Sequence, residues 1–502
     1  KRAPSAPRQD PAPLPPLMSP SFPKGCPAAA GLEPEVLEDP APLPPLMSPS
    51  FPKGCPAAAG LEPEVLEEHR RSIRAHVERG QLAGMAEGVV VEGRLVYRDL
   101  AGCADGDFGT PMTERTLFRG YSMMKPITAT ALMSLVEERL IRLDDPVSRY
   151  LPKFANLKVR RKSGKGLEEL KKPMTLRHLL MHTSGLSYGP GCLDRNDRVV
   201  ARTAGEKAYR ELSCRQDSGE VDSLEKLCEE LSEKPLMFQP GAGYEYGLGL
   251  DVAGRIMELV AGRPLRTVIR ERVLRPAGME DAAWDVPRSR ARDVCGYYRL
   301  MRQAGVAGRW LERLDGSSPE ESAYVRGSEA HYSGGVPAAG GFWGTFRTSM
   351  LFSMRDVLRF CQMVIDEGLG VTGQRVLEAA TVRSLRRNWL TMRRCADRPK
   401  PPGWTSDSVG WCPLGHVQLQ GPHAGALFMG GMSYFWLDPR RKMAAAIMTE
   451  TYWQVRPLDW RDPRDTLEQV LERAAAEGRG PRRRRAVEDA SQERKSKVRK
   501  LG

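Results

Sequence analysis

The spacing of apolar residues along the chain predicts a helix followed by a hairpin near the start of the folded part. Between residues 62 and 79, apolar side chains recur every three to four positions, which is typical of a helix with one buried face. Residues 88–99 carry two apolar runs on either side of Glu92-Gly93, a dipeptide suited to a tight turn. We therefore expect an entry helix and then a β-hairpin.

Towards the other end of the chain, the apolar pattern predicts a second pair of strands. Residues 434–438 and 443–449 are apolar runs separated by Pro439-Arg440-Arg441, where we expect the turn. A helical pattern over residues 462–476 predicts a closing helix, and residues 150–330 are expected to be mostly helix and loop. The chain thus combines strands at both ends with helices between them.

A further helix is predicted over residues 122–140. Apolar residues recur there at helical spacing, for example Ile127, Ala131 and Leu135. Pro126 is tolerated only in a first turn, where its missing N–H costs least, so the helix should begin close to Ser122. Because residues three apart share a helix face, the side chains of Ser122 and Lys125 can meet.

Ser122 and Lys125 are a candidate nucleophile and base. A serine hydroxyl needs a base at neutral pH, and an amine serves only when its proton is partly driven off. Burial and the positive end of the helix dipole both favour this by lowering the pKa of Lys125. The spacing S-x-x-K alone is common, however, and an N-cap serine followed by a solvated lysine is the structural alternative.

The residues around this pair resemble the serine β-lactamase-related family, which includes class C β-lactamases, penicillin-binding proteins, esterases and lovastatin-type acyltransferases. The similar segments follow the family order; they are residues 118–154, 175–186, 238–265, 276–279, 340–362 and 434–439. The resemblance implies an α+β fold, with an antiparallel sheet flanked by helices plus a helical domain, and an active site between the two. It implies one catalytic domain over residues 61–476.

The resemblance assigns a second catalytic position to Tyr246 and a packing position to the nearby Tyr244, through the pattern P-G-x-x-[W/F]-x-Y. A phenol beside a lysine ammonium ionises more readily, so we expect a lowered pKa for Tyr246 and a share in proton transfer with Lys125. A buried ring whose hydroxyl binds only the backbone is the structural alternative.

Leu248 stands where β-lactamases and penicillin-binding proteins usually carry an asparagine that binds the substrate's amide. Leucine cannot make that hydrogen bond, and an unpaired amide in a closed site costs discrimination of the order of several kcal/mol. The following residues 251–254, Asp-Val-Ala-Gly, resemble the esterase-like branch of the family. We therefore expect esters or thioesters as substrates.

The third family motif is expected at residues 428–433, which correspond to K-T-G, H-x-G or W-x-G on an edge strand. Gly430-Gly431-Met432 resembles the G-G-M of some acyltransferase-like members, but no Lys, His or Trp precedes the glycines, and the stretch up to Tyr434 is one or two residues short. We expect backbone N–H groups near Ser122 and in Gly431-Met432-Ser433 to form an oxyanion hole. A glycine-containing bend that leads into a core strand is the alternative.

The expected function is that of a serine hydrolase or acyltransferase that forms an acyl-enzyme on Ser122 with small carboxylic esters or thioesters. A β-lactamase-like amide hydrolase and a catalytically inactive binding or scaffold protein remain open. No cofactor is expected: His182, His416 and His423 lack metal-ligand spacing, and no nucleotide-binding motif is present. We expect His182 to be a packed structural residue, and the other two histidines to lie in a loop.

The net charge of +13 is concentrated at the C-terminus, since residues 479–500 contribute +7. The run Pro481 to Arg485 is more typical of a disordered tail or localisation signal than of a specific nucleic-acid site, so residues 477–502 are expected to be a disordered tail without a specific nucleic-acid partner. A second basic segment, Lys158 to Lys172, is expected to be a solvated loop.

Residues 10–38 recur unchanged as residues 39–67, a Pro- and Ala-rich tandem copy that indicates either a recent duplication or an assembly artefact. Residues 1–60 are therefore expected to be a disordered segment. Ten cysteines without a C-x-x-C pair favour reduced thiols in an intracellular protein. No apolar run reaches about 18 residues, so no membrane span is expected. The chain begins at Lys1 and not at Met, which leaves the compartment open, as is the oligomeric state.

Overall fold

The computed structural model describes residues 50–107, 109–189, 204–217, 220–302, 309–313, 318, 350–390 and 408–453. All of them belong to one compact unit. The first repeat copy, the predicted closing helix over residues 462–476, the basic tail and residues 340–349 of the motif segment lie outside the described residues.

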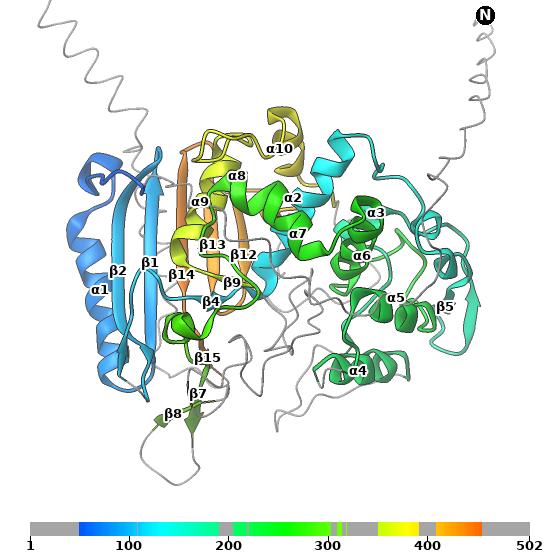
Figure 1. The fold of residues 1–502 in the computed structure, drawn as a ribbon, viewed down its shortest axis with the longest axis horizontal. Helices are drawn as coiled ribbons and strands as arrows, with labels where there is room; N and C mark the ends of the chain where they lie inside the picture. The colour runs from blue at the N-terminus through cyan, green and yellow to red at the C-terminus, as the bar shows by residue number, and fades with distance from the viewer. Residues whose placement is uncertain are drawn as a thin grey trace, which may run out of the picture. The chain divides into compact units, whose positions relative to one another are not determined.

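An antiparallel eight-stranded sheet forms the centre of this unit (Figure 1). Its strand order is β10-β11-β12-β13-β14-β1-β2-β3. The strands are β1 (Gly84–Val91), β2 (Arg94–Asp105), β3 (Thr110–Pro111), β10 (Val409–Cys412), β11 (Gly415–Gln418), β12 (Leu427–Gly430), β13 (Tyr434–Asp438) and β14 (Met443–Met448). The first and last parts of the chain meet in the middle of the sheet, where Val91 of β1 pairs with Met443 of β14.

Both predicted strand pairs are confirmed. The β1–β2 hairpin turns at Glu92 and Gly93, whose φ angles of 48° and 73° are both left-handed, as a tight hairpin turn with the native twist requires. Strands β13 and β14 turn between Asp438 and Met443. Every residue of β1 and β14 is buried, which explains their nearly continuous apolar runs.

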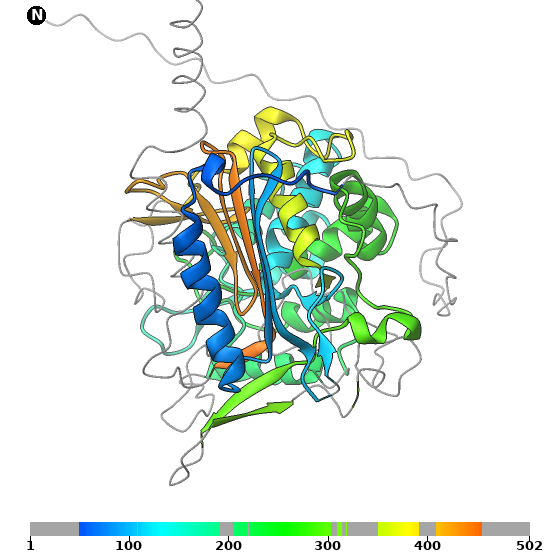
Figure 2. The same ribbon diagram turned by 90° about the vertical axis from the view of Figure 1, so that its left-hand side faces the viewer.

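Helices cover both faces of the sheet (Figure 2). The predicted entry helix is α1 (Pro63–Glu78), which packs Leu66 and Ile73 on one face. On the other face, α9 (Met354–Ile365) lies against β1, β13 and β14. This α+β arrangement of an antiparallel sheet with flanking helices is the one expected.

A mainly helical part lies beside the sheet on the side of α9 (Figure 1). Its helices are α2 (Met124–Glu137), α3 (Leu176–Leu180), α4 (Ala204–Asp217), α5 (Leu224–Ser232), α6 (Gly249–Ala261), α7 (Leu265–Ile269) and α8 (Arg275–Ala277), with α10 (Ala379–Leu385) above the sheet. A π-helical stretch, Arg270–Leu274, joins α7 to α8, and short 3₁₀ turns lie at Ala57–Ala59, Tyr121–Met123, Val147–Arg149, Pro152–Asn156 and Arg288–Asp293.

Short strands interrupt the helices of this region, and one prediction is corrected by them. The solvated loop expected over residues 158–172 contains a hairpin of β5 (Lys158–Arg160) and β6 (Leu167–Glu169). Val159 is fully buried and anchors β5, whereas most of the charged residues remain exposed. Further strands are β4 (Phe118–Arg119) paired with β9 (Leu351–Phe352), and β7 (Tyr298–Arg302) between β8 (Arg309–Arg313) and β15 (Thr451–Trp453).

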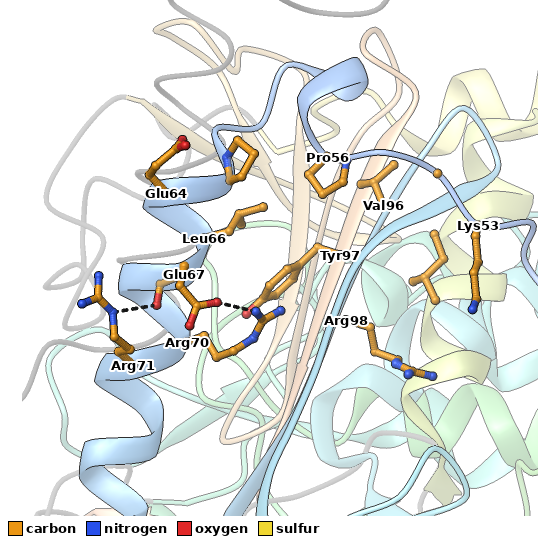
Figure 3. Close-up of a pocket in the computed structure, with 13 residues that line it drawn as sticks. Lys53, Pro56, Glu64, Leu66, Glu67, Arg70, Arg71, Val96, Tyr97 and Arg98 are labelled. Atoms are coloured by element: carbon orange, nitrogen blue, oxygen red, sulfur yellow. Dashed lines mark hydrogen bonds and ion pairs between the residues drawn. The ribbon is translucent and has the colours of Figure 1, made fainter.

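Residues 50–60, part of the segment expected to be disordered, have a defined structure, and residues 52–54 bind to β2. The backbone of Leu95 donates to the carbonyl of Pro52 and accepts from Gly54, at 2.9 and 2.8 Å. Together with the first turn of α1, this segment walls a surface groove of about 710 Å³ against β2; Lys53 and Pro56 lie on one side, and Glu64 and Glu67 on the other (Figure 3).

Candidate active site

Ser122 lies in a 3₁₀ turn, Tyr121–Met123, that leads directly into α2. The predicted helix over residues 122–140 is therefore correct in place but shorter. It begins at Met124, and it ends at Glu137 because Arg139 adopts a left-handed φ of 62° that a helix cannot accommodate. Ser122 is 2% exposed and Lys125 is 1% exposed, so both lie inside the protein.

The structure brings Ser122, Lys125 and Tyr246 into direct contact. The Ser122 Oγ lies 3.3 Å from the Lys125 Nζ and 2.7 Å from the Tyr246 hydroxyl. The Lys125 Nζ also lies over the Tyr246 ring, 4.3 Å from its centroid. Tyr246 lies three residues before the start of α6, so two helices from distant parts of the sequence, α2 and α6, position the three side chains.

Burial lowers the pKa of Lys125 to about 7, and the Asp251 carboxylate on α6 opposes part of this effect. Near pH 7 the neutral amine is therefore far more populated than in a solvated lysine, which would be almost fully protonated. A neutral amine 3.3 Å from a serine hydroxyl can accept its proton.

The expectation of an acidic phenol at Tyr246 is wrong. Burial raises the pKa of Tyr246 well above its ordinary value. The hydrogen bond with Ser122 lowers this pKa in part, whereas the Asp251 carboxylate raises it further. The expectation relied on a neighbouring ammonium, but the same burial that raises the pKa of the phenol removes much of that positive charge from Lys125. Tyr246 is therefore a neutral hydrogen-bonding group.

Aromatic rings surround the three residues, and two of them were not predicted from the sequence. Trp411, from β10, lies 5.9 Å from the Tyr246 ring and is almost fully buried. Tyr188 lies 5.7 Å from the same ring. The Tyr244 ring packs edge-on against Trp411, with 6.1 Å between the ring centroids, in agreement with its expected packing position. These rings exclude water from the amine of Lys125, which sustains its lowered pKa.

His182 packs directly against Tyr246, with 4.5 Å between the ring centroids. Its Nδ1 accepts the backbone N–H of Gly247 at 3.3 Å, and burial lowers its pKa well below the ordinary value. This neutral, buried ring is the packed histidine that was expected. His416 lies on strand β11 and not in a loop, whereas His423 does lie in a turn. Within the described ranges, no group of three or more His, Cys, Asp or Glu side chains could hold a metal.

Leu248 is the residue immediately before α6, and its side chain is 1% exposed within the main core. It offers only apolar surface to its surroundings, since it has no polar side-chain atom. The next residue, Gly249, packs so closely on Leu179 that an added Cβ would lie 2.5 Å from the Leu179 carbonyl oxygen. This close approach of α6 and α3 helps to hold Tyr246 in place.

The third motif lies at the end of β12, which contacts the turn that carries Ser122. The expected edge strand is not observed, since β12 lies between β11 and β13. However, β11 pairs only with Leu427 and Phe428, so this ladder stops before Gly430. Residues 431–433 form a tight turn into β13, closed by a 2.8 Å bond from the Gly431 N–H to the Ser433 carbonyl. Gly430 has a φ of 154°, and a Cβ there would lie 2.3 Å from the Ser433 carbonyl oxygen.

Residues 69–467 match the family model described as β-lactamase. The chain belongs to the β-lactamase family. Among its relatives in this family, protein Rv1367c of Mycobacterium tuberculosis is 32% identical over 326 residues, which cover 64% of this chain and 72% of that protein. The esterase EstB of Burkholderia gladioli is 38% identical over 204 residues, or 41% of this chain and 47% of EstB.

Solved structures of β-lactamase-family proteins also share the fold. EstCE1, described as a hydrolase with promiscuous acyltransferase activity, has a TM-score of 0.58 at 22% identity and covers 82% of this chain and 98% of its own. This likeness supports the architecture of the sheet and its helices. None of the described helices is long and apolar enough to span a membrane.

Proposed function

We propose that this β-lactamase-family protein is a serine hydrolase that forms an acyl-enzyme on Ser122 and acts on small carboxylic esters or thioesters. The observation that carries the proposal is the contact of the Ser122 Oγ with both the Lys125 amine and the Tyr246 hydroxyl, at 3.3 and 2.7 Å. The relationship to EstB, which is named an esterase, supports the same reaction class.

In the proposed reaction, the Ser122 Oγ bonds to the carbonyl carbon of the substrate while its proton passes to the neutral amine of Lys125. Backbone N–H groups of Ser122 and of the turn at residues 431–433 hold the resulting oxyanion. As the bond to the leaving alcohol breaks, that alcohol takes a proton from the Lys125–Tyr246 pair. Water then repeats the addition and releases the acid, or a second alcohol accepts the acyl group.

The preference for esters follows from the apolar side chain at position 248. A β-lactam or peptide presents an amide beside the reacting carbonyl, and leaving that amide unpaired in a closed site costs about 1–3 kcal/mol. A simple ester has no such group to satisfy. Leu248 therefore disfavours amide substrates without affecting the nucleophile.

The test is covalent labelling with a fluorophosphonate, followed by intact-mass measurement and turnover of a chromogenic short-chain ester. We expect one label on the wild type and none on Ser122→Ala. Ser134→Ala, in the adjoining helix α2, is the matched control, because the Ser134 hydroxyl donates to the Ala131 carbonyl and accepts from the Arg272 guanidinium, bonds that do not involve Ser122 or Lys125. Labelling of Ser122→Ala at the wild-type rate would exclude Ser122 as the nucleophile.

Two other outcomes would refute the proposal in different ways. A folded wild-type protein that is neither labelled nor active would indicate an inactive binding or scaffold protein. Faster turnover of a penicillin than of the short-chain ester would indicate an amide hydrolase and would contradict the argument from Leu248.

A further inference from the structure

Two adjacent residues that follow β14, Thr449 and Glu450, contact both segments that would form the oxyanion hole. Both are buried, at 0% and 1% exposure. They connect β14 to β15 and lie far in the sequence from Ser122. No motif in the sequence singled them out.

On the Ser122 side, the Glu450 carboxylate binds the segment that precedes the serine. Its Oε1 accepts the backbone N–H of Arg119 at 2.6 Å, and its Oε2 accepts the hydroxyl of Tyr121 at 3.0 Å. The Arg119 guanidinium lies 3.7 Å from the same carboxylate and donates to the Cys295 carbonyl at 2.8 Å. One carboxylate therefore joins the residues on either side of Gly120.

Tyr121 needs such an anchor, because its backbone is strained. Its φ is 41°, a left-handed conformation that costs a residue with a Cβ on the order of 1–3 kcal/mol and persists only where its surroundings hold it. The peptide bond that joins Tyr121 to Ser122 carries the Ser122 N–H. The conformation of Tyr121 therefore determines where this N–H points.

On the other side, Thr449 binds the turn between β12 and β13. The Ser433 hydroxyl accepts the Thr449 N–H and donates to the Thr449 carbonyl, both at 3.1 Å. Met432, in the same turn, belongs to a small buried apolar cluster with Tyr121 and Tyr297. The turn and the segment before Ser122 are thus bound to two neighbouring residues that follow β14, and they share one buried apolar cluster.

We propose that Thr449 and Glu450 act together as a positioning clamp, which holds the Ser122 N–H and the turn at residues 431–433 at the spacing that one oxyanion requires. This inference rests on the proposed acyl-enzyme function. The role is geometric, because Arg119 offsets the negative charge of Glu450. A donor must lie about 2.7–3.1 Å from the developing oxyanion, and a displacement of 1 Å can reduce the rate about 100-fold.

The test compares Tyr121→Phe, which removes only the hydroxyl that binds Glu450, with Ser433→Ala, which removes the bonds to Thr449. Tyr150→Phe is the matched control, since the Tyr150 hydroxyl also donates to a carboxylate, that of Asp145, at 2.7 Å in the helical part. The measurements are kcat and KM for a chromogenic ester, the inhibition constant of phenylboronic acid, which forms a tetrahedral adduct with serine, and the thermal unfolding midpoint.

We expect kcat to fall about tenfold in Tyr121→Phe and in Ser433→Ala with KM within about twofold, because the oxyanion exists only in the transition state. The affinity for phenylboronic acid should fall in the same proportion, and Tyr150→Phe should match the wild type in all three. Combining Tyr121→Phe with Glu450→Gln should reduce kcat by less than the product of the single effects, because both act through one hydrogen bond.

The clamp would be overturned if Tyr121→Phe and Ser433→Ala had the same kcat and the same affinity for phenylboronic acid as the control Tyr150→Phe. A rise in KM at unchanged kcat in these two variants would also overturn it. If Glu450→Gln does not fold, Tyr121→Phe and Ser433→Ala decide alone. A folded wild type without labelling or turnover would overturn the proposed function itself, and the clamp with it; this outcome is recognised in the wild type before any variant is made.

Discussion

The buried amine of Lys125 makes a prediction that couples stability to activity. Between its folded pKa of about 7 and its ordinary value of 10.5, the unfolded chain holds a proton on Lys125 that the folded protein does not. Lowering the pH through this window therefore favours the unfolded state and reduces the free energy of unfolding. Lys125→Met, which fills a similar volume without a charge, removes this dependence.

The expected magnitude follows from the two pKa values. Between pH 9 and pH 7, the wild type should lose about 2 kcal/mol of stability relative to Lys125→Met, which for a chain of this size shifts the unfolding midpoint by roughly a few degrees. Thermal unfolding of both proteins at several pH values measures it. The exposed Lys153→Met is the control and should follow the wild type.

Activity should depend on the same proton, because only the neutral form of the Lys125 amine can act as a base. The wild-type rate of ester hydrolysis should rise about tenfold from pH 6 to pH 8 as Lys125 becomes neutral, and Lys125→Met should lose about 10²–10⁴-fold in kcat. A wild-type rate that is flat over this range, or a Lys125→Met variant whose unfolding has the wild-type pH dependence, would refute the argument that Lys125 is a buried base.

Three further substitutions test the rest of the site. Tyr246→Phe should retain the fold and lower kcat about 10–100-fold, because it removes the 2.7 Å bond to the Ser122 Oγ; an unchanged kcat would remove Tyr246 from the mechanism. Leu248→Asn should lower the unfolding midpoint, because a polar group enters the core, while raising the ratio of penicillin to ester turnover; an unchanged ratio would contradict the specificity argument. Trp411→Ala should destabilise the protein by about 3–5 kcal/mol, because it leaves a cavity in the core. It should also shift the midpoint of the pH–rate profile to higher pH, because water then reaches Lys125; an unchanged midpoint would show that the ring does not shield the amine.

The sequence was informative where chemistry depends on local spacing. Ser122 and Lys125 are three residues apart at a helix start, so elementary helix geometry predicts their contact, and it is observed at 3.3 Å. Continuous apolar runs, which are typical of buried strands, predict strands at residues 434–438 and 443–449, and these are observed as β13 and β14. In both cases, the deciding interactions lie within one element or between neighbours.

Other parts of the site depend on contacts between distant elements, which no local pattern indicates. Trp411 reaches Tyr246 only because β10 lies at one end of the assembled sheet, and Glu450 meets Tyr121 only after β14 has paired with β1. The raised pKa of Tyr246 differs from the expected lowered one for the same reason. Its direction depends on the burial of the site, which is a property of the assembled fold and not of the motif.

The pairing of β1 with β14 also constrains how the protein is made. Val91 and Met443 are neighbours in the sheet, yet at about 5–20 residues per second a ribosome needs roughly 20 to 70 s to synthesise the chain between them. During that time, the β1 edge that later pairs with β14 has no partner strand. We therefore expect folding to be completed only after synthesis of β14, with slow, high-contact-order kinetics and a need for chaperones to protect the apolar β1 edge from aggregation.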